Sequence, residues 1–209
     1  LESKLLTKYK ILDKKSIFLL GFKYYNSNNT GEQGPGINNS EPNFNFQYDL
    51  FPNYRYQSFF TYPNLNFSFF GENIFYLSDK LSITPGFRYE NIKTESDGYY
   101  RNLNFDAAGN VILNELNYSN DIRKRSFVLL GVGISFKPSS FIEFYGNISE
   151  NYRSVTFADI SIFNPSYSIN PNITDESGMT ADFGLRGNIK NFISYDISLF
   201  NLSYNDRIG

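Results

Sequence analysis

The sequence contains no cysteine, no histidine and no tryptophan, and only one of its 209 residues is methionine. Without cysteine the chain forms neither disulfides nor thiolate metal sites. Without histidine it lacks Cys-His and Ser-His catalytic pairs and the usual zinc sites. The adjacent acids Asp175 and Glu176 fall in a predicted loop, and no nucleophile and base with plausible spacing accompany them. We therefore expect the protein not to be an enzyme and to need no cofactor or metal.

Long apolar runs and an excess of basic charge are also missing. No segment approaches the roughly 18 consecutive apolar residues of a membrane helix, and no basic stretch followed by an apolar one, as in a signal peptide, opens the chain. The formal charge is −2, and no basic stripe predicts a nucleic-acid partner. Strand-like runs reach both ends of the sequence, so we expect the chain to be a fragment.

Aromatic residues are abundant, with 22 Phe and 17 Tyr, a balance that favours β-strands. The clearest strand pattern lies in residues 64–92, around the predicted turn 78–80. From Leu81 to Tyr89 apolar side chains alternate with polar ones, which is typical of a β-hairpin with one apolar face. Each run has about a dozen residues, whereas strands of soluble domains usually have about 5–6 and a strand crossing a bilayer needs roughly 9–11.

Short and long connections alternate along the whole chain. We predict strands at 2–12, 15–26, 64–77, 80–93, 122–137, 140–151, 178–190 and 192–207. Tight turns are predicted at 13–14, 78–80, 138–139 and 191, and long polar loops at 27–63, 94–121 and 152–177. This alternation is typical of an outer-membrane barrel, with short periplasmic turns and long extracellular loops. The alternative is a soluble β-sandwich, in which loops longer than about 12–15 residues are uncommon.

Side-chain alternation assigns the two faces of the predicted strands. In the fifth run Val128, Leu130, Val132, Ile134 and Phe136 share one face, which we assign to lipid. A charge facing lipid at the midplane costs roughly 2–4 kcal/mol. We therefore expect Glu143, Asp182 and Arg186 to point into the lumen.

Two further features concern strand ends. In the eighth run apolar residues change face between Leu199 and Phe200, which indicates either a bulge or the point where the strand leaves the membrane. Aromatic girdles mark membrane interfaces, and without Trp they would consist of Tyr and Phe. The candidates near strand ends are Tyr24, Tyr25, Phe75, Tyr76, Phe141 and Phe192.

Three segments resemble the TonB-dependent outer-membrane receptors, and within them the branch of the ferric dicitrate receptor. The first contains FGENIF at 70–75 and LSITPGFRYE at 81–90. The second is NYRSVTF at 151–157, where Ser154 replaces the more usual proline. The third contains INPN at 169–172, GLRG at 184–187 and YDISLF at 195–200.

This resemblance implies an all-β protein, an antiparallel transmembrane β-barrel in the bacterial outer membrane. Residues 1–209 would form a partial barrel domain of about eight consecutive strands, and the whole barrel would have about 22 strands around a plug. The plug domain and the box that contacts TonB would lie outside this chain. The implied partners are a ferric chelate, outer-membrane lipid, the protein's own plug and TonB.

A ferric chelate is anionic, and Arg matches its carboxylates with two parallel hydrogen bonds. As ligand-binding residues at the extracellular mouth we predict Arg55, Tyr56, Arg101, Arg123 and Arg153, and we considered Arg125, Tyr54, Tyr99, Tyr100 and Tyr152 beside them. For each arginine the alternative is a solvated loop charge or an ion pair with an acid such as Asp97 or Glu150. As lumenal residues in contact with the plug or with one another we predict Glu72, Arg88, Glu90 and Arg186.

Two classes of function remain open. The first is a receptor for active, TonB-energised import of a ferric chelate, either iron-citrate or another siderophore. The second is a barrel with another use, either TonB-dependent import of carbohydrate or peptide or passive diffusion through a pore.

Overall fold

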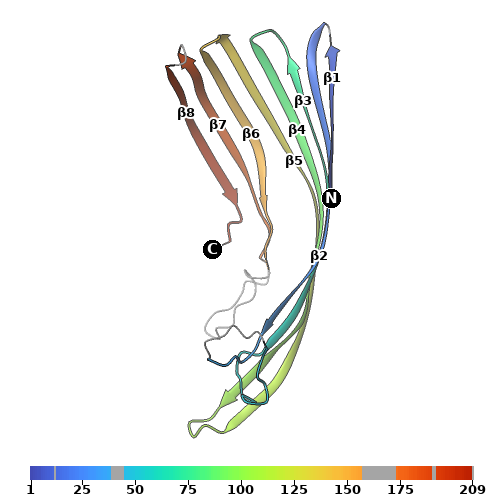
Figure 1. Cartoon of the computed structure of the whole chain (residues 1–209), viewed down its shortest axis with the longest axis vertical. Coiled ribbons are helices and arrows are strands. Elements are labelled where there is room, and N and C mark those ends of the chain that lie inside the picture. Colours follow the sequence, from blue (N-terminus) through green and yellow to red (C-terminus); the bar gives the residue numbers. More distant parts are fainter. Residues whose placement is uncertain (12, 39–44, 157–172, 190–191, 209) are drawn as a thin grey trace. The chain divides into compact units, whose positions relative to one another are not determined.

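The computed structural model describes residues 1–11, 13–38, 45–156, 173–189 and 192–208, and these contain eight strands and no helix. The strands are β1 (Glu2–Ile11), β2 (Lys14–Gln33), β3 (Ser58–Tyr76), β4 (Leu81–Phe105), β5 (Val111–Ser139), β6 (Ile142–Arg153), β7 (Glu176–Ile189) and β8 (Ile193–Asn205). They form one sheet in chain order (Figure 1). The predicted all-β meander is confirmed, and the described residues include no helix suited to crossing a membrane.

Contacts between residues divide the chain into two units, which we describe separately. The first unit comprises residues 1–23, 67–90 and 126–209, and the second comprises residues 24–66 and 91–125.

Tight turns join strand pairs of the first unit, and Figure 1 shows the β3–β4 and β5–β6 turns at the same end of the strands. Ile11 pairs directly with Lys14, and Asp13 between them has φ = 62°, a left-handed conformation that Asp tolerates. In the second turn the Ser78 hydroxyl accepts hydrogen bonds from the backbone N–H groups of Lys80 (3.2 Å) and Leu81 (3.1 Å). The predicted turn at 191 lies outside the described residues.

The third turn differs from its prediction at 138–139. β5 continues to Ser139, and the turn consists of Ser140 and Phe141. The pairing register shifts between Phe136 and Ser139, which marks a β-bulge around Pro138. Proline has no N–H to donate to a neighbouring strand, so it is found in strands mainly at edges and bulges. The prediction ended the strand at proline, whereas the bulge lets the strand pass through it.

The two faces of the first unit differ as predicted. On β5 the side chains of Val128, Leu130 and Ile134 are at least half exposed, at 52%, 57% and 50%. On the opposite face Glu143 pairs with Arg186, and Asn147 pairs with Asp182, in the β6–β7 register. Of the two alternatives for the eighth strand, the bulge is wrong, because β7 and β8 pair in unbroken register from Ser177↔Asn205 to Ile189↔Ile193. That this strand leaves the membrane near Phe200 stays a prediction.

The second unit contains more strand than the sequence predicts. The predicted loop 94–121 is wrong, because β4 continues to Phe105 and β5 begins at Val111, with a turn at 106–110. The predicted loop 27–63 is also shorter, since β2 extends to Gln33 and β3 begins at Ser58. Tyr24 and Tyr25, predicted near a strand end, therefore lie within β2.

This sheet lacks a conventional core. Among the described residues only Leu103 (2% exposed) and Val155 (3% exposed) are buried hydrophobic residues. A single sheet has no second layer against which to bury its apolar face. Removing that face from water is favourable by about 25 cal/mol per Å², so an apolar surrounding such as lipid stabilises this structure.

Candidate functional site

Arg101 anchors a loop of the second unit to two strands. Its Nη1 donates to the carbonyl oxygens of Pro52 (2.6 Å) and Tyr54 (3.4 Å), and its Nε donates to Oδ1 of Asn114 on β5 (2.8 Å). The Arg101 backbone N–H also donates to the Gln57 carbonyl (2.8 Å). One β4 residue therefore holds both sides of the segment that carries Arg55 and Tyr56.

Arg55 and Tyr56 are exposed on this anchored loop. The guanidinium of Arg55 lies 5.6 Å from the centre of the Phe105 ring, a cation–π contact. Tyr56 is 61% exposed, and its ring lies 6.1 Å from that of Tyr54 in an edge-to-face arrangement. Within the described part of the chain Arg55 has no carboxylate partner. It is therefore available to an anionic ligand, with an aromatic side chain beside it.

Arg123 and Arg125 do not join this group. Arg123 Nε donates to Asp121 (3.2 Å), and Arg125 Nη1 donates to the Thr94 hydroxyl (3.1 Å). Arg123 and the Arg101 partner Asn114 are nine residues apart on β5. Because side chains alternate between faces along a strand, an odd separation places them on opposite faces. The sequence predicted Arg101 and Arg123 in one site, and the structure does not bring them together.

Tyr48 is a polar group of this loop that the sequence analysis did not select. Its hydroxyl donates to Oε1 of Glu32 (3.2 Å), and its ring lies 5.9 Å from that of Phe46. Burial raises the pKa of Tyr48 to about 12, and the negatively charged hydrogen-bond partner acts in the same direction. Tyr48 is therefore a neutral donor at physiological pH and ties the loop to the end of β2.

Arg153 belongs to the first unit and is already paired with an acid. Its Nη1 donates to Oε1 of Glu176 (2.8 Å), whose side chain is only 6% exposed. The same oxygen accepts from the Ile208 backbone N–H (2.6 Å). Nearby, Asp175 accepts from the Val155 backbone N–H (2.7 Å) and from the Tyr152 hydroxyl. The sequence showed these acids next to each other but contained no signal that they face β6.

Polar side chains form a ladder on one face of the first unit. Arg186 Nε and Nη2 donate to the two carboxylate oxygens of Glu143, at 3.0 and 3.1 Å, and Ser135 donates to the same carboxylate at 2.6 Å. The Arg186 guanidinium also lies 5.1 Å from the centre of the Tyr145 ring. Tyr145 in turn donates to Asp196 on β8 (2.7 Å). The predicted lumenal residue Arg186 is thus engaged within the barrel wall.

The other predicted lumenal residues belong to β3 and β4. Arg88 contacts Glu90 on the same strand, and its guanidinium lies 6.0 Å from the centre of the Phe70 ring. Glu90 is 5% exposed, and its Oε2 has no hydrogen-bond partner among the described residues. Glu72 is exposed. The prediction that some of these residues contact one another holds for Arg88 and Glu90.

No metal centre is evident in the described residues, since they contain no group of three or more acidic side chains that could hold an ion. The candidate site on the second unit consists of the Arg55 side chain, the exposed Tyr56 ring and the Arg101 bonds that hold their loop.

Residues 5–209 match the family described as TonB dependent receptor-like, beta-barrel. No curated protein matches this chain.

Three solved structures are similar to the chain at low sequence identity. The ferric-catecholate import receptor Fiu from E. coli K12 has a TM-score of 0.67 and 11% identity, over 97% of this chain and 30% of Fiu. The ferric yersiniabactin uptake receptor FyuA from Yersinia pestis has a TM-score of 0.64 and 12% identity, over 99% of this chain and 28% of FyuA. The siderophore receptor PiuA from Acinetobacter baumannii has a TM-score of 0.57 and 14% identity, over 95% of this chain and 30% of PiuA. The chain therefore spans less than one third of each receptor.

Proposed function

Because this chain belongs to the TonB dependent receptor-like β-barrel family, we propose that it is part of an outer-membrane receptor for active import of a ferric chelate. The match over residues 5–209 is the observation that carries this proposal. The three similar structures are named for a ferric catecholate, ferric yersiniabactin and a siderophore, so they support this class of ligand. Import would depend on TonB and on a plug domain inside a barrel of about 22 strands.

We place the direct contact with the chelate at Arg55 and Tyr56. The guanidinium of Arg55 has no acidic partner in the described ranges, and Tyr56 is exposed beside it. An anionic chelate with carboxylate groups, such as iron-citrate, would accept two hydrogen bonds from this one side chain. Arg101 holds the loop, while Arg123 and Arg153 each neutralise an acid, so we assign these three predicted ligand residues to positioning.

The plug contact involves the polar face of the first unit. Glu72 is exposed, and Glu90 has one carboxylate oxygen without a partner in the described residues. Arg88 and Arg186 have partners within the sheet, so we assign them to the support of that surface.

The test is uptake of ⁵⁵Fe by cells that carry the full-length receptor in a strain without its own ferric receptors. We expect uptake from an iron-limited medium with ferric citrate or another siderophore, and loss of uptake when TonB is deleted. Uptake that persists without TonB would contradict the proposal and would instead support a passive pore. TonB-dependent uptake of an oligosaccharide or peptide, with none of any ferric chelate, would overturn the ligand class.

The residue test compares Arg55→Ala with Arg55→Lys. Loss of a charge-assisted hydrogen bond costs roughly 1.5–3 kcal/mol, so we expect Arg55→Ala to weaken chelate binding about tenfold to a hundredfold. Lysine keeps the charge but loses the bidentate geometry, so the chelate affinity of Arg55→Lys should lie between those of Arg55→Ala and the unmodified receptor. Unchanged binding by Arg55→Ala at normal surface levels would remove Arg55 from the site.

A further inference from the structure

The fifth strand forms an open edge of the second unit. This unit contains segments of β2, β3, β4 and β5 in that order, so residues 111–125 of β5 lie at one side of its sheet. The described register of β5 with β6 covers only Gly131 to Ser139, in the first unit. Within the described residues, the 111–125 segment therefore has β4 on one side. On its other side alternate residues direct their backbone N–H and C=O groups away from the sheet.

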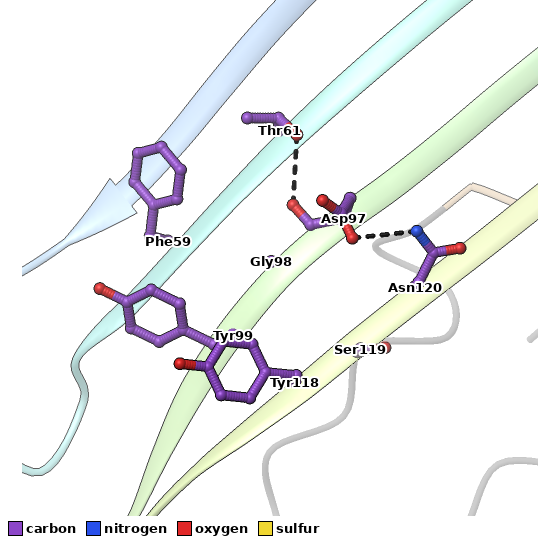
Figure 2. Close-up of a pocket in the computed structure, with 8 residues that line it drawn as sticks. All are labelled: Phe59, Thr61, Asp97, Gly98, Tyr99, Tyr118, Ser119 and Asn120. Carbon is purple, nitrogen blue, oxygen red and sulfur yellow. Dashed lines mark hydrogen bonds between the residues drawn. The ribbon is translucent and has the colours of Figure 1, made fainter.

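Contacts with β4 hold the middle of this segment. The Asn120 amide donates to Oδ1 of Asp97 (2.9 Å), and the Tyr118 ring lies 5.7 Å from the Tyr99 ring at an interplanar angle of 56° (Figure 2). Ser119 lies between these two contact residues, and its side chain points to the opposite face because side chains alternate along a strand. The strand is thus fixed to its sheet before any partner arrives.

Apolar side chains line the open edge. Those of one face are 66%, 45%, 78% and 49% exposed at Ile112, Leu116, Tyr118 and Ile122, respectively. A long, exposed edge strand with apolar side chains readily pairs with another strand, and proteins usually shorten, charge or cover such edges. We therefore expect another strand to cover this one.

The sequence of the segment is complementary to itself. In an antiparallel pair of two copies aligned on Ser119, Glu115 lies opposite Arg123 and Leu116 lies opposite Ile122. Each of these pairs occurs twice, because across a two-fold axis residue i faces j and residue j faces i. Opposite charges and apolar side chains that lie directly across two strands stabilise their pairing.

Neighbouring registers lack this match. Alignment one residue earlier would place Glu115 opposite Asp121, which are both acids, and alignment one residue later would place Leu116 opposite Lys124. A parallel pair in register would place the basic residues 123–125 opposite their own copies. Like charges directly opposite each other are destabilising. The antiparallel pair centred on Ser119 is therefore favoured over these three arrangements.

We propose that this edge binds the same edge of a second copy of the chain, as an antiparallel strand pair centred on Ser119. Backbone hydrogen bonds would join the two second units into one continuous sheet, as in other cases of strand addition. Arg123 would keep its bond to Asp121 (3.2 Å) and gain a second acid from the other copy. The interface contains neither Arg55 nor Tyr56, so it does not depend on the chelate site.

A disulfide tests this register in the purified full-length receptor in detergent, where two copies are free to take either relative orientation. Opposite Cα atoms of an antiparallel pair are about 4.5–5.5 Å apart, which is within reach of a disulfide. This chain contains no cysteine of its own. We expect Ser119→Cys to form a covalent dimer on mild oxidation. The control is Asn29→Cys, exposed on β2 at the other edge of the unit, which should remain monomeric. No dimer of Ser119→Cys, or an equal yield from both variants, would overturn the inference.

Exchange of charge is an independent test, measured by sedimentation equilibrium. Glu115→Arg alone would place two arginines opposite each other, and Arg123→Glu alone would place two glutamates opposite each other. We therefore expect each variant to weaken self-association about tenfold or more. A mixture of the two variants restores opposite charges at both pairs, so dimers of one variant with the other should form about as well as those of the unmodified receptor.

A receptor that is monomeric at every concentration would overturn the proposal and leave the edge to a strand of another protein. No recovery in the mixture, with both variants folded, would also overturn it. If either variant fails to fold, the result with Ser119→Cys decides alone.

Discussion

Arg153 and Glu176 face each other as the last residue pair of the β6–β7 register, and a hydrogen bond of 2.8 Å joins them. The Glu176 side chain is 6% exposed, while that of Arg153 is 44% exposed. The carboxylate therefore depends on this partner more than the guanidinium does. This geometry favours a structural role for Arg153, the alternative that the sequence left open for every loop arginine.

Replacement of Arg153 by alanine would leave the Glu176 carboxylate buried and without its cationic partner. Among the described residues, it would then accept a hydrogen bond from the Ile208 backbone N–H. An unsatisfied buried acceptor costs about 1–3 kcal/mol, so we expect the free energy of unfolding of the full-length receptor to fall by about that amount. Urea unfolding in detergent measures it. The double variant Arg153→Ala/Glu176→Gln should recover part of the loss because it buries no charge. An equal loss in the single and double variants would contradict this explanation.

Arg186→Lys separates charge from geometry in the polar ladder. Lysine keeps the positive charge but cannot form the two parallel bonds that Arg186 makes to Glu143. Because the Arg186 side chain is 52% exposed, solvent screens the pair, and we expect a loss of only about 1 kcal/mol. To measure this change, samples of the receptor are heated to a series of temperatures before gel electrophoresis. The temperature at which the compact, fast-migrating band disappears should fall slightly in the variant. A loss as large as that of Glu143→Ala would show that the bidentate geometry matters more than we infer.

Gly98→Ala should disrupt the pairing of β3 with β4 in the second unit. A Cβ at Gly98 would lie 2.0 Å from the Phe59 carbonyl oxygen and 2.7 Å from Cα of Phe60, and these backbone atoms cannot yield without separating the strands. Overpacking of this kind costs about 1–3 kcal/mol. We expect faster amide hydrogen exchange at residues 58–62 and 96–100. Gly36→Ala is the matched control, because a Cβ there meets no atom within 4 Å; equal effects of the two variants would refute the steric argument.

Asp106 should make the β4–β5 turn sensitive to acid. Its carboxylate accepts hydrogen bonds from the side chain and backbone of Asn110 (2.9 and 2.7 Å) and from the Ala108 backbone (2.9 Å), and these bonds lower the pKa of Asp106. With the folded-state pKa below that of the unfolded turn, the stabilisation is present above the ordinary pKa and is lost as pH falls through the lowered one.

Amide exchange at residues 108–110 tests this pH dependence by comparison of the unmodified chain with Asp106→Ala. We expect greater protection in the unmodified chain at neutral pH and convergence of the two as the carboxylate becomes protonated. A difference that stays constant with pH would assign the effect to packing of the side chain and not to its charge.

The sequence predicted strands best where only one face is apolar. β6 and β7 begin and end within two residues of their predicted bounds, because a sheet with one apolar face imposes a period of two. Residues 94–105 and 111–121 are strands without that pattern, since both of their faces carry polar and aromatic side chains. A signal was nevertheless present: Asp106 and Gly109 frame the turn, and Gly109 has φ = 87°.

The candidate site was harder to predict than the strands. Arginine and tyrosine could be selected by type, and Arg55 and Tyr56 are adjacent in the sequence. Which arginines already have partners depends on contacts between distant residues, such as Arg101 with Pro52 and Arg153 with Glu176. Neither composition nor periodicity contains that information, because cross-strand register and loop conformation determine it.

The anchored loop has a further consequence for the energetics of recognition. A segment that becomes ordered only when its ligand arrives loses conformational entropy at that moment, and its affinity falls accordingly. Here the bonds from Arg101 to Pro52, Tyr54 and Gln57 fix the loop during folding. Arg55 and Tyr56, which we propose contact the chelate, are thus preorganised, and we expect substitutions at these two exposed positions to change ligand preference while the scaffold beneath them stays intact.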